Sequence, residues 1–193
     1  MVTTLSTIAT LQSGIVLSRK KTTVENGAFE YKRLNLRAVN ETGYVVSSEL
    51  EMFYTEDMLA PSQLTQCGDI VIRLFAPLFP TVITEADAGL VVPSQLALIR
   101  PRSEAVLPTY LQMCLSRQSV IEALLSRESG VHRSITVKAI SDLKIPLIPM
   151  PKQQKIVRIY ELSKQRSQLY QKLIEQEQLQ IESVIESMIG GSQ

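Results

Sequence analysis

The stretch LKIPLIPMPKQQKIVRIYELSKQRSQLYQKL, residues 143–173, contains the transition on which the interpretation of the whole chain depends. Pro146, Pro149 and Pro151 interrupt a short apolar segment, and no further proline or glycine occurs before Gly190. Proline disfavours the α conformation in the residue before it, but it suits the first position of a helix. The stretch therefore predicts an extended hinge, followed by a long helix that begins at Pro151.

The predicted helix, residues 152–189, would be about 57 Å long at about 1.5 Å per residue. It has an imperfect apolar stripe, in which Ile174, Ile181 and Met188 are seven residues apart. Such a helix is stabilised by packing its stripe, either on its own domain or on a second long helix in a coiled coil. We favour the coiled coil. The predicted dimerisation residues are Ile156, Tyr160, Leu169, Tyr170, Leu173, Ile174, Ile181, Val184 and Met188.

Composition points to an ordinary globular chain. The 193 residues are 45% hydrophobic and 20% charged, which suits one domain with an appendage. Two distant cysteines, Cys67 and Cys114, indicate a reducing, cytoplasmic setting. We expect neither a signal peptide nor a membrane span, because long apolar runs are missing. The net charge of +1 does not by itself indicate a nucleic-acid partner.

Short strands are predicted before the hinge. Residues 70–75 follow the turn residues Gly68 and Asp69 and read as a strand, and residues 80–101 suggest further short strands in a mostly antiparallel sheet. Residues 31–39 alternate, with Leu34, Leu36 and Ala38 facing one way and Arg33 and Arg37 the other, as on a half-buried strand.

Helical signals occur at both ends of this region. Residues 5–13 suggest a short helix that ends at Gly14, and residues 107–126 show helical spacing. Thr136 is placed to cap a short helix before the hinge. The predicted fold class is α+β: a twisted, mostly antiparallel sheet with a few helices in residues 1–150, followed by a long C-terminal coiled-coil helix in residues 151–193.

Residues with catalytic or metal-binding chemistry are sparse. The one histidine, His132, lies beside Arg133 in a polar loop, which favours a surface or binding-loop role over a general base. The sequence shows no ligand spacing for a metal, no nucleophile elbow, no phosphate loop and no dinucleotide fingerprint. We therefore expect no catalytic residues, no metal and no cofactor in this chain, and the sequence argues against an enzyme.

The order and spacing of five segments resemble one half of the DNA-specificity subunit of type I restriction–modification systems. The segments correspond to the family's opening helix and loop, first strand and turn, Gly-Asp strand start, strand-then-helix passage, and proline hinge with long helix. In this chain they read ATLQSGIVLSRK, YKRLNLRAVNETGYV, LTQCGDIVIRLFAP, VVPSQLALIRP with LPTYLQMCLSRQ, and SITVKAISDLKIPLIPMPKQQKIVRIYELSKQ.

The resemblance implies a target recognition domain that reads one part of a bipartite site in double-stranded DNA. It also implies a spacer helix that pairs antiparallel with its counterpart. Two adenine methyltransferase subunits, which use S-adenosylmethionine, and in some systems restriction subunits, would bind the assembly. The usual subunit has two recognition domains and two helices. One of each in this chain leads us to expect a half-size form that acts as a homodimer.

Candidate DNA-binding residues are basic or imidazole side chains on predicted loops and strands, because Arg and Lys bind phosphates and base edges. A coiled-coil adaptor whose globular head binds protein is the alternative to this function. Sequence-specific DNA binding that weakens steeply with salt would distinguish the two. The candidates are Arg19, Lys20, Lys21, Arg33, Arg37, Arg73, His132 and Arg133.

Overall fold

The computed structural model describes residues 1–20, 22–23, 29–102, 104–126 and 134–190. The chain divides into two compact units, Met1–Gln153 and Gln154–Gln193. We refer to the first unit as the head and to the second as the arm.

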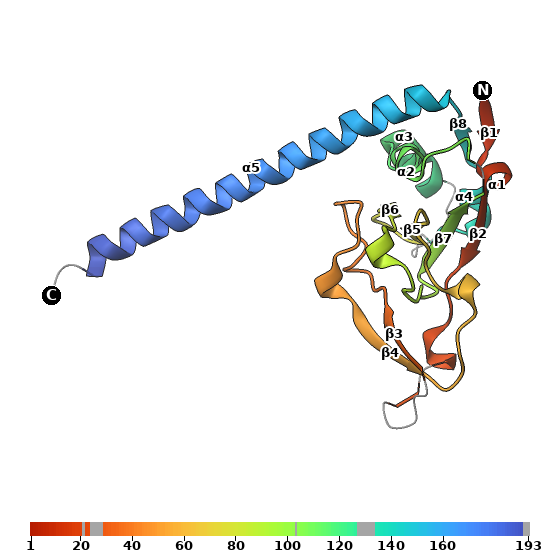
Figure 1. Cartoon of the computed structure of the whole chain (residues 1–193), viewed down its shortest axis with the longest axis horizontal. Helices are drawn as coiled ribbons and strands as arrows, with labels where there is room; N and C mark the ends of the chain where they lie inside the picture. Colours follow the sequence, from red (N-terminus) through yellow and green to blue (C-terminus); the bar gives the residue numbers. More distant parts are fainter. Residues whose placement is uncertain (21, 24–28, 103, 127–133, 191–193) are drawn as a thin grey trace. The chain divides into compact units, whose positions relative to one another are not determined.

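Four antiparallel strands form the central sheet of the head (Figure 1). Their order is β2 (Ala9–Ser13), β7 (Leu96–Pro101), β5 (Ile70–Arg73) and β6 (Thr81–Val82). The two central strands, β5 and β7, are almost entirely apolar and buried, as expected for strands covered on both faces. The predicted α+β class with a mostly antiparallel sheet is confirmed.

Two smaller sheets, each of two antiparallel strands, complete the head. The β3 strand (Phe29–Arg33) pairs with β4 (Glu51–Thr55), and β1 (Val2–Thr4) pairs with β8 (Lys144–Pro146). Figure 1 places these two sheets at opposite ends of the head. Because β8 belongs to the proline hinge, its pairing with β1 brings the chain's first residues beside the start of the long helix.

The head also contains short helices, and the long helix begins within it. Thr136 caps one of them as predicted, because its Oγ1 accepts a hydrogen bond from the Ala139 N–H at 3.1 Å. The α-helices are α1 (Leu5–Ile8), α2 (Pro108–Leu115), α3 (Gln118–Leu125), α4 (Val137–Ser141) and α5 (Met150–Gly190). Single 3-10 turns occur at η1 (Leu17–Arg19), η2 (Ser47–Glu49), η3 (Pro61–Gln63) and η4 (Glu85–Asp87).

The main apolar cluster lies between the central sheet and the segments that cover it. A second, smaller cluster of Phe53, Leu59 and Val91 packs beneath the β3–β4 sheet. Together the clusters attach that sheet to the rest of the head through apolar contacts. The buried members of the main cluster are Leu34, Ala38, Val39, Val71, Ile83, Leu90, Val92, Leu96 and Leu98.

The prediction of a helix over residues 5–13 is wrong beyond Ile8. The helical turn α1 is only four residues long, and residues 9–13 form β2, which pairs along its whole length with β7. Gly14 follows a strand, where the backbone passes so close to its neighbour that a Cβ atom would lie 2.2 Å from the carbonyl oxygen of Pro93. Pairing with a distant strand overrode the weak local helix preference.

The prediction of one strand over residues 31–39 is also wrong, because β3 ends at Arg33. Asn35 turns the chain: its Oδ1 accepts from the Ala38 N–H at 2.8 Å, and its Nδ2 donates to the Glu49 carbonyl at 2.6 Å. An asparagine side chain can replace strand hydrogen bonds in this way. Arg33 and Arg37 therefore do not share a strand face, although Leu34 and Ala38 are buried as expected.

The hinge and long helix follow the prediction closely. The α5 helix is 41 residues long, with Pro151 in its first turn. None of the described helices combines the length and the hydropathy needed to cross a membrane.

Candidate nucleic-acid interface

The loop that contains Arg19 and Lys20 lies beside the end of β4. Both basic residues are exposed, at η1 and directly after it. The loop is attached to the β3–β4 sheet by Thr22, whose N–H donates to the Tyr54 carbonyl at 3.1 Å and whose hydroxyl donates to Glu56 at 3.1 Å. These contacts hold Thr22 against the end of β4.

Arg33 and Arg37 lie around the turn that ends β3. The Arg33 guanidinium forms an ion pair with Glu51 across the β3–β4 sheet, and its side chain is 26% exposed. Glu51 also accepts from the Asn35 amide at 2.7 Å, so the ion pair and the turn are connected. Arg37 is exposed in the turn itself. The structure thus separates these two arginines by a turn and does not place them on a shared strand face.

Arg73, by contrast, is engaged with the main chain of that same turn. Its Nε donates to the Val39 carbonyl at 3.0 Å, its terminal nitrogen donates to the Leu36 carbonyl, and its guanidinium lies 4.9 Å from the centroid of the Phe79 ring. Burial lowers the pKa of Arg73 from its ordinary value. Arg73 is one of the predicted DNA-binding residues, and in this structure its guanidinium holds the main chain of the turn that carries Arg37.

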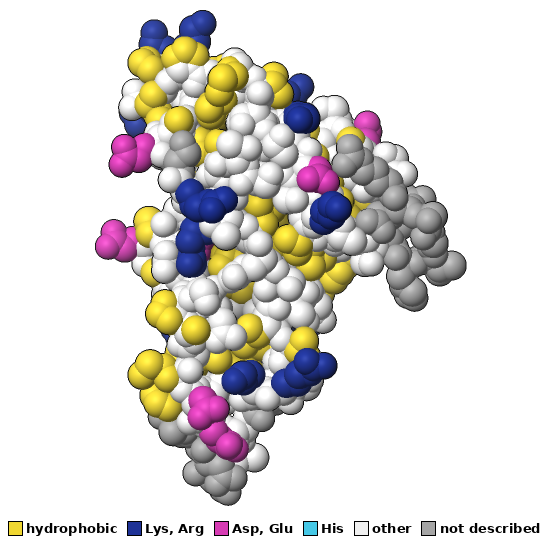
Figure 2. Space-filling view, turned by 90° about the vertical axis from the view of Figure 1, so that its right-hand side faces the viewer, with side chains coloured by type: hydrophobic (Ala, Val, Ile, Leu, Met, Phe, Trp, Pro, Cys, Tyr) yellow, Lys and Arg dark blue, Asp and Glu magenta, His cyan; other side chains and the backbone are white. Residues whose placement is uncertain are grey.

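Three predicted candidates, Lys21, His132 and Arg133, lie outside the described residues. Figure 2 shows one face of the molecule, on which Lys and Arg side chains stand in separate groups with hydrophobic and acidic side chains between them. On that face the described residues do not form one continuous basic surface.

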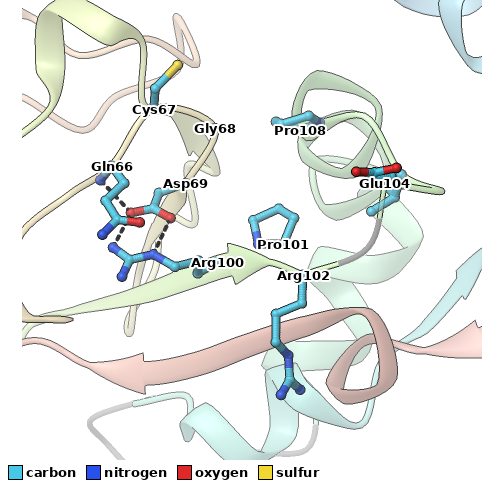
Figure 3. A pocket seen from close by; sticks show the side chains of 10 residues that line it. Gln66, Cys67, Gly68, Asp69, Arg100, Pro101, Arg102, Glu104 and Pro108 are labelled. Atoms are coloured by element: carbon cyan, nitrogen blue, oxygen red, sulfur yellow. Dashed lines mark hydrogen bonds and ion pairs between the residues drawn. The ribbon is translucent and has the colours of Figure 1, made fainter.

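Sequence reasoning missed a buried ion pair in the central sheet. Arg100 of β7 donates to both carboxylate oxygens of Asp69, at 2.8 and 2.7 Å, and to the Leu64 carbonyl at 2.9 Å (Figure 3). The Asp69 side chain is 1% exposed, and the hydrogen bond from Arg100 to Asp69 is the main cause that raises the pKa of Arg100. Asp69 also makes the predicted turn bond, accepting from the Gln66 N–H at 2.7 Å. The arginine partner could not be predicted because it is 31 residues away.

A pocket of about 340 Å³ opens beside this ion pair. Figure 3 shows Asp69 and Arg100 pointing toward each other at one side, while Arg102 points away and donates to the carbonyls of Ser6 and Ala9. Among the described residues, no cluster of histidine, cysteine, aspartate and glutamate could hold a metal ion. The bidentate pair joins the residue before β5 to β7 and thereby ties these two segments together.

The arm presents its apolar side chains to the surface. Ile174 is 48% exposed, Ile181 60% and Met188 75%, which is unusual for aliphatic side chains that recur on one helix face. Leu169, Tyr170, Leu173 and Val184 are exposed as well, whereas Ile156 and Tyr160 are partly buried. Lys164 lies 5.3 Å over the Tyr160 ring, one helical turn away, and burial raises the pKa of Tyr160.

Solved structures share the fold of this chain, a head followed by a long helix. The HsdS subunit from Thermoanaerobacter tengcongensis matches 97% of this chain with a TM-score of 0.70 and 18% identity. The chain has the fold of a type I specificity subunit. A second match is a chain from a structural study of complex assembly and conformational transition of the type I R-M system. It matches 95% of this chain with a TM-score of 0.67 and 18% identity. The S subunit from M. genitalium matches the full chain at a TM-score of 0.59 and 15% identity.

The chain spans about half the length of these specificity subunits, covering 47%, 43% and 46% of theirs. No protein-family model matches the sequence, and no curated protein matches it. The similarity to these specificity subunits is therefore a similarity of fold, and it covers one head and one long helix. The sequence motifs predicted the same half of a specificity subunit.

Proposed function

We propose that this chain is a non-catalytic DNA-specificity subunit of a type I restriction–modification system. The observation that carries the proposal is the match of nearly the whole chain to specificity subunits, with both the head and the 41-residue helix included. The head is the target recognition domain, and it reads one part of a bipartite target in double-stranded DNA.

The second part of the target is read by a second copy of the chain. The exposed apolar stripe of α5 supports this proposal, because a stripe of that length is stabilised by pairing with another long helix. Antiparallel pairing of two copies gives a homodimer with a head near each end. In the head, Arg19, Lys20, Arg33 and Arg37 are proposed to contact DNA, together with Lys21, His132 and Arg133.

The homodimer positions adenine methyltransferase subunits, which bring S-adenosylmethionine, and it can also bind restriction subunits. The test is to co-express the chain with its neighbouring methyltransferase and to sequence the methylated adenines in the host DNA. We expect methylation at one interrupted sequence that is absent without this chain. Methylation that does not depend on the chain would contradict the proposal and favour the adaptor whose head binds protein.

Lys20→Ala and Arg37→Ala test the proposed contacts. A phosphate contact, expected of Lys20, lowers affinity for all sequences alike and flattens the salt dependence. A base contact, expected of Arg37, costs about 1–3 kcal/mol and relaxes the preference at one position. Glu41→Ala, another exposed change beyond the same turn, is the control that should leave binding intact.

A further inference from the structure

Gln153 is the one residue of α5 that is buried, among those whose burial the structure describes. Its side chain is 0% exposed, although it lies on a helix whose remaining surface is largely solvated. Glutamine is seldom fully buried without a specific partner network. The next residue of the helix, Gln154, is exposed, so the burial belongs to this position and not to the segment.

Three hydrogen bonds connect the Gln153 side-chain amide to main chain outside α5. Oε1 accepts from the Leu107 N–H at 3.0 Å, and Nε2 donates to the carbonyls of Ala105 and Ile148 at 2.7 and 2.8 Å. Both amide hydrogens and the carbonyl oxygen are thus used. One side chain joins the first turn of α5 to the segment before α2 and to the hinge.

Both segments that Gln153 joins are themselves fixed in the head. The Tyr110 hydroxyl of α2 donates to the Pro146 carbonyl of β8 at 2.7 Å. The hinge continues the β1–β8 pairing, since the Leu147 N–H donates to the Met1 carbonyl at 2.7 Å. The hinge is therefore bound to the head at Pro146 and Leu147, and the bonds of Gln153 continue this attachment into the first turn of α5.

A small change at the root of a long helix has a large effect at its far end. The part of α5 beyond Gln153 is about 55 Å long at about 1.5 Å per residue. A pivot of about 10° at the root displaces the far end by about 10 Å, which corresponds to about three base pairs of DNA. A spacer helix can measure a distance only if its first turn is held.

We propose that Gln153 is a positioning residue that anchors the first turn of α5 in the head and thereby limits the half-site spacings that the dimer accepts. The spacing part rests on the proposed function. Anchoring the first turn is a property of the chain alone, so the two parts can fail separately.

The test compares Gln153→Met, which keeps the length of the side chain without its amide, with Gln154→Met on the exposed side of the same turn. If the methionine variant does not fold, Gln153→Glu replaces it in the test, because glutamate retains an acceptor for the Leu107 N–H. Spin labels are attached to the native exposed thiol of Cys67 in the head and to Gln165→Cys in the arm. Labelled chain is diluted into unlabelled chain, and pulsed electron resonance measures the distance distribution between the labels.

The distribution should broaden about twofold in Gln153→Met or Gln153→Glu, because a freed root lets the helix pivot, and it should be unchanged in Gln154→Met. Selection from random DNA with the methyltransferase present should then return the same half-sites with several spacings instead of one. A merely stabilising residue would lower the yield of bound DNA without changing the spacing.

Equal distance distributions in all variants would overturn the inference whatever the DNA result. A broader distribution with unchanged spacing would overturn the spacing role and leave the proposed function standing. If the unmutated chain selects no interrupted site, the proposed function and the spacing role fail together. The distance distributions then decide whether Gln153 holds the helix.

Discussion

At the residue scale, two arginines serve the fold through contacts that join distant segments. Arg100 neutralises the buried Asp69 carboxylate, and Arg73 holds the main chain of the turn at residues 36–39. The two arginines that remain exposed or half-exposed near that turn, Arg37 and Arg33, are the ones proposed to contact DNA. Arg73, which has a structural role, therefore lies at the same turn as arginines that are proposed to contact DNA.

Arg73→Met should lower the free energy of unfolding by about 1–3 kcal/mol, because the Leu36 and Val39 carbonyls lose their donor in a partly buried place. Urea unfolding followed by circular dichroism measures the change. Arg37→Met, an exposed arginine in the same turn, is the matched control and should shift stability by less than about 0.5 kcal/mol. Equal midpoints for the two variants would show that the turn does not depend on Arg73.

Tyr110 and Cys114 should make the head sensitive to alkaline pH. Burial raises the pKa of Tyr110 to about 12 and also raises the pKa of the Cys114 thiol above its ordinary value of 9.0. A raised pKa in the folded state means that stability is complete below the unfolded value and is lost as pH rises toward the folded value. The free energy of unfolding should therefore fall from about pH 9 upward, and Tyr110 should contribute above pH 10.0.

Urea unfolding between pH 7 and pH 11 measures this loss. In Cys114→Ala the fall should begin about one pH unit later, because the contribution of Tyr110 begins only near its unfolded pKa of 10.0. A fall that begins at the same pH in both proteins would contradict the assignment to Cys114. Cys67→Ala is the control, since that thiol is exposed.

At the scale of elements, α5 has an apolar face that requires a partner. Ile174 and Ile181 lie seven residues apart on it, and both are about half exposed. The head, by comparison, buries its apolar residues within its own clusters. Helices in proteins gain most of their stability from packing an apolar face rather than from intrinsic propensity, so the exposed stripe of the arm favours a partner.

Replacing both Ile174 and Ile181 by Asp should convert a dimer into monomers, because two charges would be buried without partners in the helix pair. Light scattering at tens of micromolar measures the mass. The matched control is Gln165→Asp with Lys172→Asp, which also lie seven residues apart but in a heptad position that none of the predicted dimerisation residues occupies. A monomeric unmutated chain would contradict the homodimer.

At the scale of the whole molecule, the symmetry of a homodimer determines the form of the target. Two identical heads related by a two-fold axis read the same bases in opposite directions, so the target should be an interrupted palindrome. The gap between its halves should depend on the length of α5. An asymmetric target would instead indicate a second, different specificity chain as the partner.

Deleting one heptad, Gln171 to Glu177, should shorten the arm by about 10 Å, close to three base pairs, while keeping the seven-residue phase of the stripe. We expect unchanged half-sites with a shorter preferred spacing, or loss of binding if the shorter dimer cannot span both. Selection of bound sequences from random DNA, with the methyltransferase present, measures the spacing. An unchanged gap would show that α5 is not the spacer.

The sequence by itself determined the features that depend on neighbouring residues. The prolines of the hinge, the cap at Thr136, the turn at Gly68 and Asp69, and the uninterrupted helix after Pro151 are local signals, and each is confirmed. The order and spacing of five segments also resemble those of the specificity subunits, and that fold is confirmed. Propensity, capping and proline geometry act within a few residues, so they can be predicted from the sequence.

Only the tertiary structure decided which distant residues meet. It made residues 9–13 a strand by pairing them with β7, and it ended β3 at Arg33 through Asn35 and Glu49. It also joined Arg100 to Asp69, placed Arg73 on the turn at residues 36–39, and buried Gln153 against Ala105 and Leu107. These contacts are set by the packing of segments tens of residues apart, and no local pattern encodes them.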